Sequence, residues 1–140
     1  MTLVVDTGPL VASVDRRDPR HRDVARIVRA AAERLVVPAP VTAEVDYLVR
    51  GRVGAEPARL LLEDMAAERY EVVSLEAHEH RLVADLDRQY GDLGLGLADL
   101  SVVVLARRFD TRRILTFDER DFRAVRPLQG GAFTLLPADR

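Results

Sequence analysis

The sequence contains no cysteine and no lysine, and these two absences remove whole classes of chemistry. Without cysteine there is no disulfide, no thiolate metal site and no cysteine nucleophile. Without lysine there is no Gly-Lys-Ser/Thr loop of the kind that P-loop nucleotidases use to bind phosphate. No apolar run approaches the roughly 20 residues that a bilayer-spanning helix needs. The amino terminus meets Asp6 without a preceding basic segment, so we expect no secretory signal.

The remaining composition is typical of a single globular domain. The 140 residues are 48% hydrophobic and 31% charged, which is sufficient for one hydrophobic core. We therefore expect one domain over residues 1–140, located in the cytoplasm and not associated with a membrane. The net charge of −2 argues against a strongly basic nucleic-acid-binding protein.

Short apolar runs and helical periodicity alternate along the chain. The apolar runs predict strands over residues 1–5, 35–37, 71–74, 113–117 and 132–136. Apolar residues at helical spacing predict helices over residues 9–14, 20–33, 42–50, 57–69, 78–89 and 95–108. Such alternation predicts an α/β fold with three layers, α/β/α, around a largely parallel sheet. Ligands of these sheets bind beyond the carboxyl ends of the strands.

Five acidic residues lie in or directly after apolar segments, where a carboxylate is costly. They are Asp6, Glu44, Asp99, Asp118 and Asp121. An isolated buried carboxylate costs several kcal/mol unless it is paired, protonated or bound to a metal. If the first and fourth strands are neighbours, the carboxylates that follow them meet at one edge of the sheet. A shared site for a hard cation is the simplest explanation for this set.

Each acid also has a purely structural interpretation. Asp6 could cap the helix that begins near Pro9, and Asp118 could cap the turn that follows it. Glu44, taken alone, is better interpreted as an exposed residue of an amphipathic helix. Asp99 resists such an interpretation, because the apolar helix predicted over 95–108 places it too far from either end to act as a cap. Together, acids from four separate segments suit Mg²⁺ or Mn²⁺, which prefer oxygen ligands.

Four motifs of the chain resemble those of the PIN-domain ribonucleases, and within them the VapC toxins of bacterial toxin–antitoxin pairs. The motifs are Val4–Leu10 (VVDTGPL), Val41–Val45 (VTAEV), Leu97–Ser101 (LADLS) and Leu115–Phe122 (LTFDERDF). The resemblance covers essentially the whole chain. It implies a PIN-like fold with a central five-stranded parallel sheet, and endoribonuclease activity that depends on Mg²⁺ or Mn²⁺.

The resemblance also implies roles for individual residues. Asp6, Glu44, Asp99 and Asp118 match the acidic positions that hold the metal and carry catalysis. Thr116 matches a hydroxyl that supports the site, and Asp121 matches a position that varies in the family, so it has a supporting role here. The implied reaction is in-line attack by an activated water, which leaves a 5′-phosphate and a 3′-hydroxyl. The implied partners are an RNA substrate, a cognate antitoxin that covers the acidic pocket, and a second copy in a homodimer.

The sequence features argue against several other classes of protein and site. A phosphoacceptor receiver domain shares the sheet and an acidic Mg²⁺ pocket, but it relies on a lysine that this chain lacks. An inactive PIN-like scaffold that binds RNA or a partner would be free to lose the four acids, and all four are present. His78 and His80 do not share a helix face, which argues against a zinc site. Two arginine clusters, Arg16–Arg22 and Arg107–Arg113, could contact RNA, although solvated surface is the more common role of such clusters.

Overall fold

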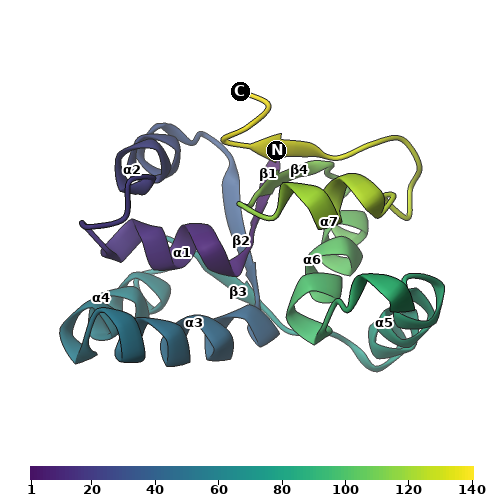
Figure 1. Ribbon diagram of the computed structural model, residues 1–140, viewed down its shortest axis with the longest axis horizontal. Coiled ribbons are helices and arrows are strands. Elements are labelled where there is room, and N and C mark those ends of the chain that lie inside the picture. The colour runs from purple at the N-terminus through teal and green to yellow at the C-terminus, as the bar shows by residue number, and fades with distance from the viewer.

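The computed structural model describes all residues from 1 to 140 and has five strands and seven α-helices (Figure 1). The strands are β1 (Thr2–Val5), β2 (Arg34–Pro38), β3 (Glu71–Val73), β4 (Arg113–Leu115) and β5 (Thr134–Leu136). The helices are α1 (Thr7–Val14), α2 (His21–Ala30), α3 (Ala39–Arg52), α4 (Ala55–Ala66), α5 (Ala77–Gln89), α6 (Leu97–Arg108) and α7 (Glu119–Ala124). A short 3₁₀ helix, η1 (Gly91–Leu93), precedes α6.

The five strands form one parallel sheet in the order β3-β2-β1-β4-β5. β1 is the central strand, where Val4 pairs with Val36 of β2 on one side and Ile114 of β4 on the other. β1 is buried along its whole length, as expected for a strand of a parallel sheet with both faces covered. The predicted parallel sheet and the predicted adjacency of the first and fourth strands are therefore confirmed.

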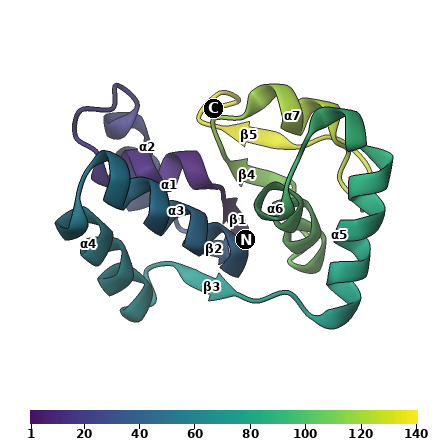
Figure 2. The same ribbon diagram turned by 60° about the horizontal axis from the view of Figure 1, so that its bottom comes forward.

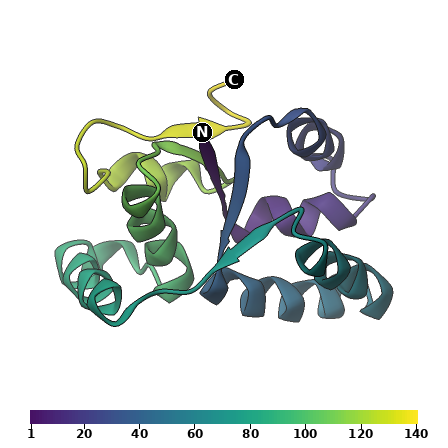
Figure 3. The same ribbon diagram turned by 180° about the vertical axis from the view of Figure 1, so that it is seen from behind.

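Helices cover both faces of the sheet. Figure 2 shows α1 to α4 on one side of the strands and α5 to α7 on the other, which gives the predicted three layers. The same division is visible from behind in Figure 3, where β2 and β3 lie between the two groups of helices. α6 is buried from Leu100 to Ala106 without interruption, which confirms the prediction of a buried helix. No helix of the structure combines the length and the apolar character that a membrane crossing needs.

Most element ends differ from the sequence prediction by a few residues, and two short helices were not predicted; the start of α3 and these two helices have local reasons. α3 begins at Ala39, so Pro40 lies in its first turn, where a missing backbone N–H costs nothing. η1 occupies part of the segment expected to be a loop. α7 was predicted as a turn, because its six residues carry a single fully buried apolar side chain, Phe122, and periodicity cannot emerge over so short a length.

Candidate active site

Asp6 lies directly after β1 and its side chain is almost completely buried, with 5% of its surface exposed. Its backbone N–H donates to the carbonyl of Leu115 at 2.9 Å, which fixes it to the end of β4. Oδ2 accepts a hydrogen bond of 2.7 Å from the Thr116 hydroxyl, and the side chain makes no capping bond to α1. The other oxygen, Oδ1, is buried without any hydrogen-bond partner. The interpretation of Asp6 as the cap of α1 is therefore wrong, and Oδ1 of Asp6 remains without a hydrogen bond.

Thr116 connects Asp6 to Asp118. Its Oγ1 donates to Asp6 and at the same time accepts from the backbone N–H of Asp118 at 3.0 Å. Asp118 stands at the start of α7, where its Oδ1 accepts from the backbone N–H of Asp121 at 3.4 Å. The predicted capping role of Asp118 is thus confirmed, although the bond is long and weak. Only one carboxylate oxygen is used in it, so the cap leaves the second oxygen of Asp118 available.

Asp99 is the third residue of α6, and the prediction that it lies too far from a helix end to cap it is wrong. The helix begins at Leu97 and not at 95, because Gly94 is in the left-handed conformation (φ 66°) and Gly96 is extended. The Oδ2 of Asp99 accepts from the backbone N–H of Gly96 at 3.4 Å. This bond is as long as the one made by Asp118, and the Asp99 side chain remains half-buried.

The carboxylates of these segments influence one another electrostatically. Burial raises the pKa of Asp6 to about 6, against the lowering effect of the hydrogen bond from Thr116, and the charges of Asp99 and Asp118 raise it further. Burial likewise raises the pKa of Asp118 to about 6, with further contributions from Asp121 and Asp99. The pKa of Asp99 is also raised, by burial and then by the charge of Asp121. Carboxylates that raise the pKa of one another share one low-dielectric region.

Glu44 does not belong to this electrostatic group. It lies exposed in the first half of α3, without a hydrogen bond or an ion pair to another side chain. Its charge is not among the causes that raise the pKa values of Asp6, Asp99 and Asp118. The electrostatic group therefore contains three of the four predicted acids, namely Asp6, Asp99 and Asp118. It also contains Asp121, for which a supporting role was predicted. The role of Glu44 remains a prediction from the resemblance.

The acids do not form a ready-made metal cage. No group of three or more acidic, histidine or cysteine side chains is arranged to hold an ion. Unscreened carboxylates in a region of low dielectric repel one another, which favours separation until a cation neutralises them. The donor set consists entirely of carboxylate oxygens, the ligand type of Mg²⁺ and Mn²⁺. The buried Oδ1 of Asp6 has no hydrogen-bond partner, and an ion bound to it would supply the missing interaction.

Gly8 and Phe117 form a close contact beside the acids that the sequence analysis missed. A Cβ on Gly8 would lie 2.9 Å from Cδ2 of Phe117, so only glycine permits this approach. The guanidinium of Arg20 covers the same ring at 3.9 Å from its centroid. Phe117 follows Thr116 directly, so the contact joins the start of α1 to the segment that holds Asp6. The Asp-Thr-Gly-Pro sequence was the available signal, because glycine after a buried strand often marks close packing.

Several residues named as alternatives have structural roles. In the second arginine cluster, Arg108 pairs with Glu79, Arg113 pairs with Glu33 and Arg112 donates to the carbonyl of Gly130. His78 and His80 are exposed on α5 and lie outside the acidic region. These observations leave the first arginine cluster as the one whose role is still to be explained.

Comparison with known proteins places this geometry in context. The family model of the PIN domain matches residues 3–127. The chain is 40% identical over 135 residues to Ribonuclease VapC26 of Mycobacterium tuberculosis, which covers 96% of this chain and 100% of that protein. Among solved structures, VapC20 of Mycobacterium tuberculosis, described as a Sarcin-Ricin loop cleaving toxin, has a TM-score of 0.79 at 17% identity and covers 85% of this chain and 92% of its own. VapBC2 of Rickettsia felis, bound to a promoter DNA fragment, has a TM-score of 0.68 at 17% identity, covering 96% and 98%.

Proposed function

This chain belongs to the PIN-domain family, in its VapC group, and from that premise we propose that it is a metal-dependent endoribonuclease and the toxin of a toxin–antitoxin pair. Its relative over nearly the full length is a ribonuclease, which supports hydrolysis of RNA phosphodiester bonds. The observation that carries the proposal is the Asp6 carboxylate, which is buried beside other acids with one oxygen unpartnered. A stable fold gains nothing from such a group, whereas a cation site requires it.

Asp6, Asp99 and Asp118 are the residues that would hold Mg²⁺ or Mn²⁺, with Glu44 as a further ligand proposed from the family resemblance. The chemistry supplied by the bound ions is the acidification of water and the neutralisation of charge on the phosphodiester. Thr116 orients one oxygen of Asp6 by donating to it, so the free oxygen has a defined direction. The backbone N–H of Asp121 donates to Oδ1 of Asp118, and the Asp121 carboxylate adds negative charge to the same region.

The chain's own residues also set the proton balance of the proposed reaction. In-line attack by water on the phosphorus breaks the bond to the 3′-oxygen, which leaves as a 3′-hydroxyl after gaining a proton, and the phosphate stays on the 5′ side. The raised pKa values of Asp6 and Asp118 place these carboxylates closer to neutral pH than an exposed aspartate. These values hold for the metal-free chain and would fall once a cation is bound, so the acid that accepts the proton of the attacking water is one member of the site that is not assigned further.

A protein partner is part of the proposal. Similar folds occur in toxin–antitoxin complexes from Rickettsia felis and Klebsiella pneumoniae, at 17% and 15% identity. We propose that a cognate antitoxin covers the acidic region of this chain and presents a basic group to it, since a cation from a partner would relieve the same repulsion as a metal ion. A homodimer is proposed on the family resemblance alone.

The test is RNA cleavage with and without divalent cations, read by sequencing the ends of the products. We expect the wild-type chain to cleave RNA in Mg²⁺ or Mn²⁺ and to stop when EDTA is added. Asp6→Asn and Asp99→Asn should each lose cleavage by at least about 100-fold, as expected when a metal ligand is removed. Asp87→Asn, which changes an exposed aspartate of α5, is the matched control and should retain activity.

The same experiment separates the proposal from its alternative. If Asp6→Asn cleaves RNA as the wild type does, the assignment of the site is wrong. If the wild-type chain binds RNA or a partner and cleaves nothing in any divalent cation, the chain is an inactive scaffold and the enzymatic proposal fails.

A further inference from the structure

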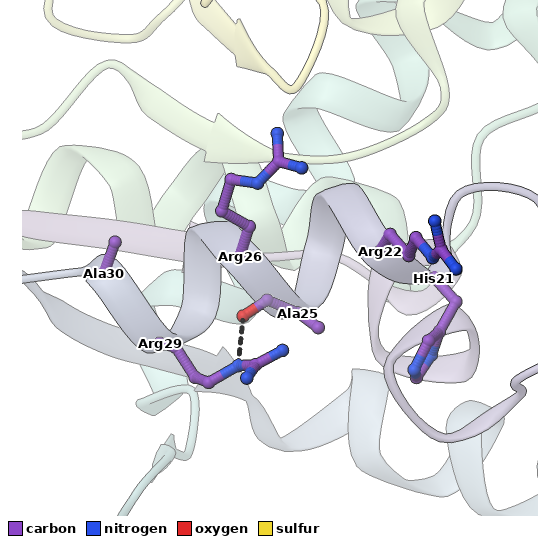
Figure 4. Close-up of a pocket in the computed structure, with 6 residues that line it drawn as sticks. All are labelled: His21, Arg22, Ala25, Arg26, Arg29 and Ala30. Atoms are coloured by element: carbon purple, nitrogen blue, oxygen red, sulfur yellow. Dashed lines mark hydrogen bonds between the residues drawn. The ribbon is translucent and has the colours of Figure 1, made fainter.

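The exposed face of α2 carries a row of arginines that the acidic site does not use. Val24 is buried and Ile27 and Val28 are packed against the core, so the opposite side of the helix faces solvent. Arg22, Arg26 and Arg29 lie on that side at spacings of four and three residues, together with Ala25 and Ala30. Figure 4 shows the side chains of Arg22, Arg26 and Arg29 leaving α2 in different directions. These residues line an open hollow of about 730 Å³.

Positive charge is concentrated in this part of the molecule. Residues 15–30 contain six arginines and three aspartates, a net charge of +3, whereas the whole chain has a net charge of −2. The remainder of the chain therefore carries −5. Attraction for a polyanion is decided by such local concentrations of charge and not by the total.

The arginines of this segment are also unusually free of internal partners. Carboxylates lie within ion-pair distance of eleven of the 21 arginines. Four of the other ten fall within residues 16–29, namely Arg16, Arg17, Arg22 and Arg29. Arg52 has no such partner either, and it lines a second hollow together with Arg16 and Arg17. With Arg52, half of the ten arginines without a carboxylate partner therefore lie around the loop before α2 and on its outer face, where Arg29 also donates to the carbonyl of Ala25.

This arginine face, defined as Arg16, Arg17, Arg22, Arg26 and Arg29, adjoins the acidic site through Arg20. The guanidinium of Arg20 stacks on Phe117, which follows the Thr116 that holds Asp6. A hollow of about 330 Å³ lies beside this contact, and its lining includes Arg20, Asp23, Thr116, Phe117, Glu119 and Arg140. The eight residues of α1 separate Asp6 from the start of the arginine segment by ~12 Å.

We propose that this arginine face binds the phosphate backbone of the RNA strand on one side of the bond that is cut. The proposal rests on the ribonuclease function proposed above, and it assigns the substrate path of that site. The distance of ~12 Å corresponds to about three or four stacked nucleotides at ~3.4 Å each. The row from Arg22 to Arg29 is ~10 Å long, so it spans about three more.

The chemistry of the face favours a phosphate backbone over an acidic peptide. Guanidinium groups bind phosphate oxygens through charge-assisted hydrogen bonds. The only apolar residues that line the hollow on α2 are Ala25 and Ala30, so it has no pocket for a large apolar side chain. No Phe, Tyr or Trp lines it, and Nδ1 of His21, the one imidazole in the lining, donates to the carbonyl of Ala12, so contacts to bases would be few. Binding by this face should therefore be strong in low salt, insensitive to base sequence and weakened by added salt.

The test measures RNA binding by the full chain with Asp6→Asn in place, so that bound RNA is not cleaved. The probe is a fluorescently labelled single-stranded RNA of mixed sequence, titrated at salt concentrations between about 50 and 200 mM. The test variant adds Arg22→Gln and Arg29→Gln. The control variant adds Arg81→Gln and Arg126→Gln, which remove two exposed arginines without ion pairs from α5 and from the segment after α7.

We expect the test variant to bind this RNA about tenfold more weakly at low salt than the control variant. Its slope of log affinity against log salt should be smaller by about 1.4, because each lost phosphate contact to a single strand removes about 0.7. Both variants change the net charge equally, so a general effect of charge would affect them equally.

Equal affinity and equal salt slope in the two variants would overturn the proposal, as would an absence of RNA binding by the Asp6→Asn chain. A poly-glutamate peptide that binds the control variant more tightly than the test variant, without a matching difference for RNA, would assign the face to an acidic protein partner and would also overturn it. Failure of the ribonuclease proposal is detected separately, by the absence of cleavage in the wild-type chain.

Discussion

Replacing Asp6 by asparagine should make the metal-free protein more stable at neutral pH, although it destroys the proposed site. The side chain is 5% exposed, and burial raises its pKa from 3.8 to about 6. At neutral pH the Asp6 carboxylate is therefore ionised in both states, and its charge costs more free energy in the folded protein than in the unfolded chain. Asparagine is nearly the same size and has no charge, and its carbonyl can still accept the bond from Thr116.

The magnitude follows from the shift in pKa. A rise from 3.8 to about 6 corresponds to about 3 kcal/mol of destabilisation once both states are ionised. The asparagine amide would take the place of the unpartnered Oδ1, and a buried unpaired donor costs about 1–2 kcal/mol. The net gain is then about 1–2 kcal/mol, which for a chain of 140 residues raises Tm by ~3–6 °C.

The pH dependence of this gain has a definite sign. Between pH 3.8 and about 6 the folded wild type holds a proton that the unfolded chain has released. Its stability therefore falls as the pH rises through this window and becomes independent of Asp6 above it. Asp6→Asn lacks this fall, so its advantage above pH 6 should be lost towards pH 4, where the cost of the unpaired amide makes it the less stable of the two.

Urea denaturation in EDTA at about pH 4.5 and about pH 7.5 measures both effects. Asp87→Asn, on the exposed side of α5, serves as the control and should show neither. The reasoning is refuted if Asp6→Asn is less stable than the wild type at the higher pH, or if the difference is the same at both. Addition of Mg²⁺ should stabilise the wild type and leave Asp6→Asn unchanged, because only the former retains the ligand.

Three further substitutions test the surroundings of the site. Thr116→Val removes the donor to Asp6 and should lower cleavage by about 10- to 100-fold, while Thr116→Ser retains most activity; initial rates in Mg²⁺ measure this. Gly8→Ala places a Cβ 2.9 Å from the Phe117 ring and should cost about 1–3 kcal/mol in urea denaturation, and combination with Phe117→Ala should recover part of the loss. Glu79→Gln removes the charge that pairs with the partly exposed Arg108 and should lower the free energy of unfolding by about 2 kcal/mol. The cleavage rate per folded molecule should equal that of the wild type, and a lower rate would show that the pair also supports the site.

The sheet was predictable because its signal is strong in each strand. Parallel strands buried on both faces appear as short apolar runs, and β1 and β2 are of this kind. Asp6 and Asp118 could be placed at one edge because each directly follows such a run, and the pairing of β1 with β4 confirms that placement. For these residues, position along the chain and position in space are connected by simple rules of sheet geometry.

The errors around Asp99 have a different origin, which is glycine conformation. The start of α6 depended on Gly94 adopting a left-handed conformation, and the sequence does not distinguish that from a helix that begins at Leu95. The capping bond of Asp99 was missed for the same reason, because it exists only if the helix begins at Leu97. The exposure of Glu44 on α3 agrees with the interpretation of that residue taken alone, whereas its role in the site, implied by the resemblance, stays a prediction.

The order of the strands determines when the site can exist during synthesis. β1 is made first and occupies the centre of the sheet, but its neighbour β4 and the hydroxyl that binds Asp6 come 110 residues later. The acidic residues can therefore meet only after most of the chain has left the ribosome, because contacts so distant in sequence form late. A nascent or prematurely ended chain that stops before β4 contains Asp6 and Asp99 but lacks Thr116 and Asp118, so its site is incomplete. Any activity that needs the whole set would therefore be absent until the last quarter of the chain has been made.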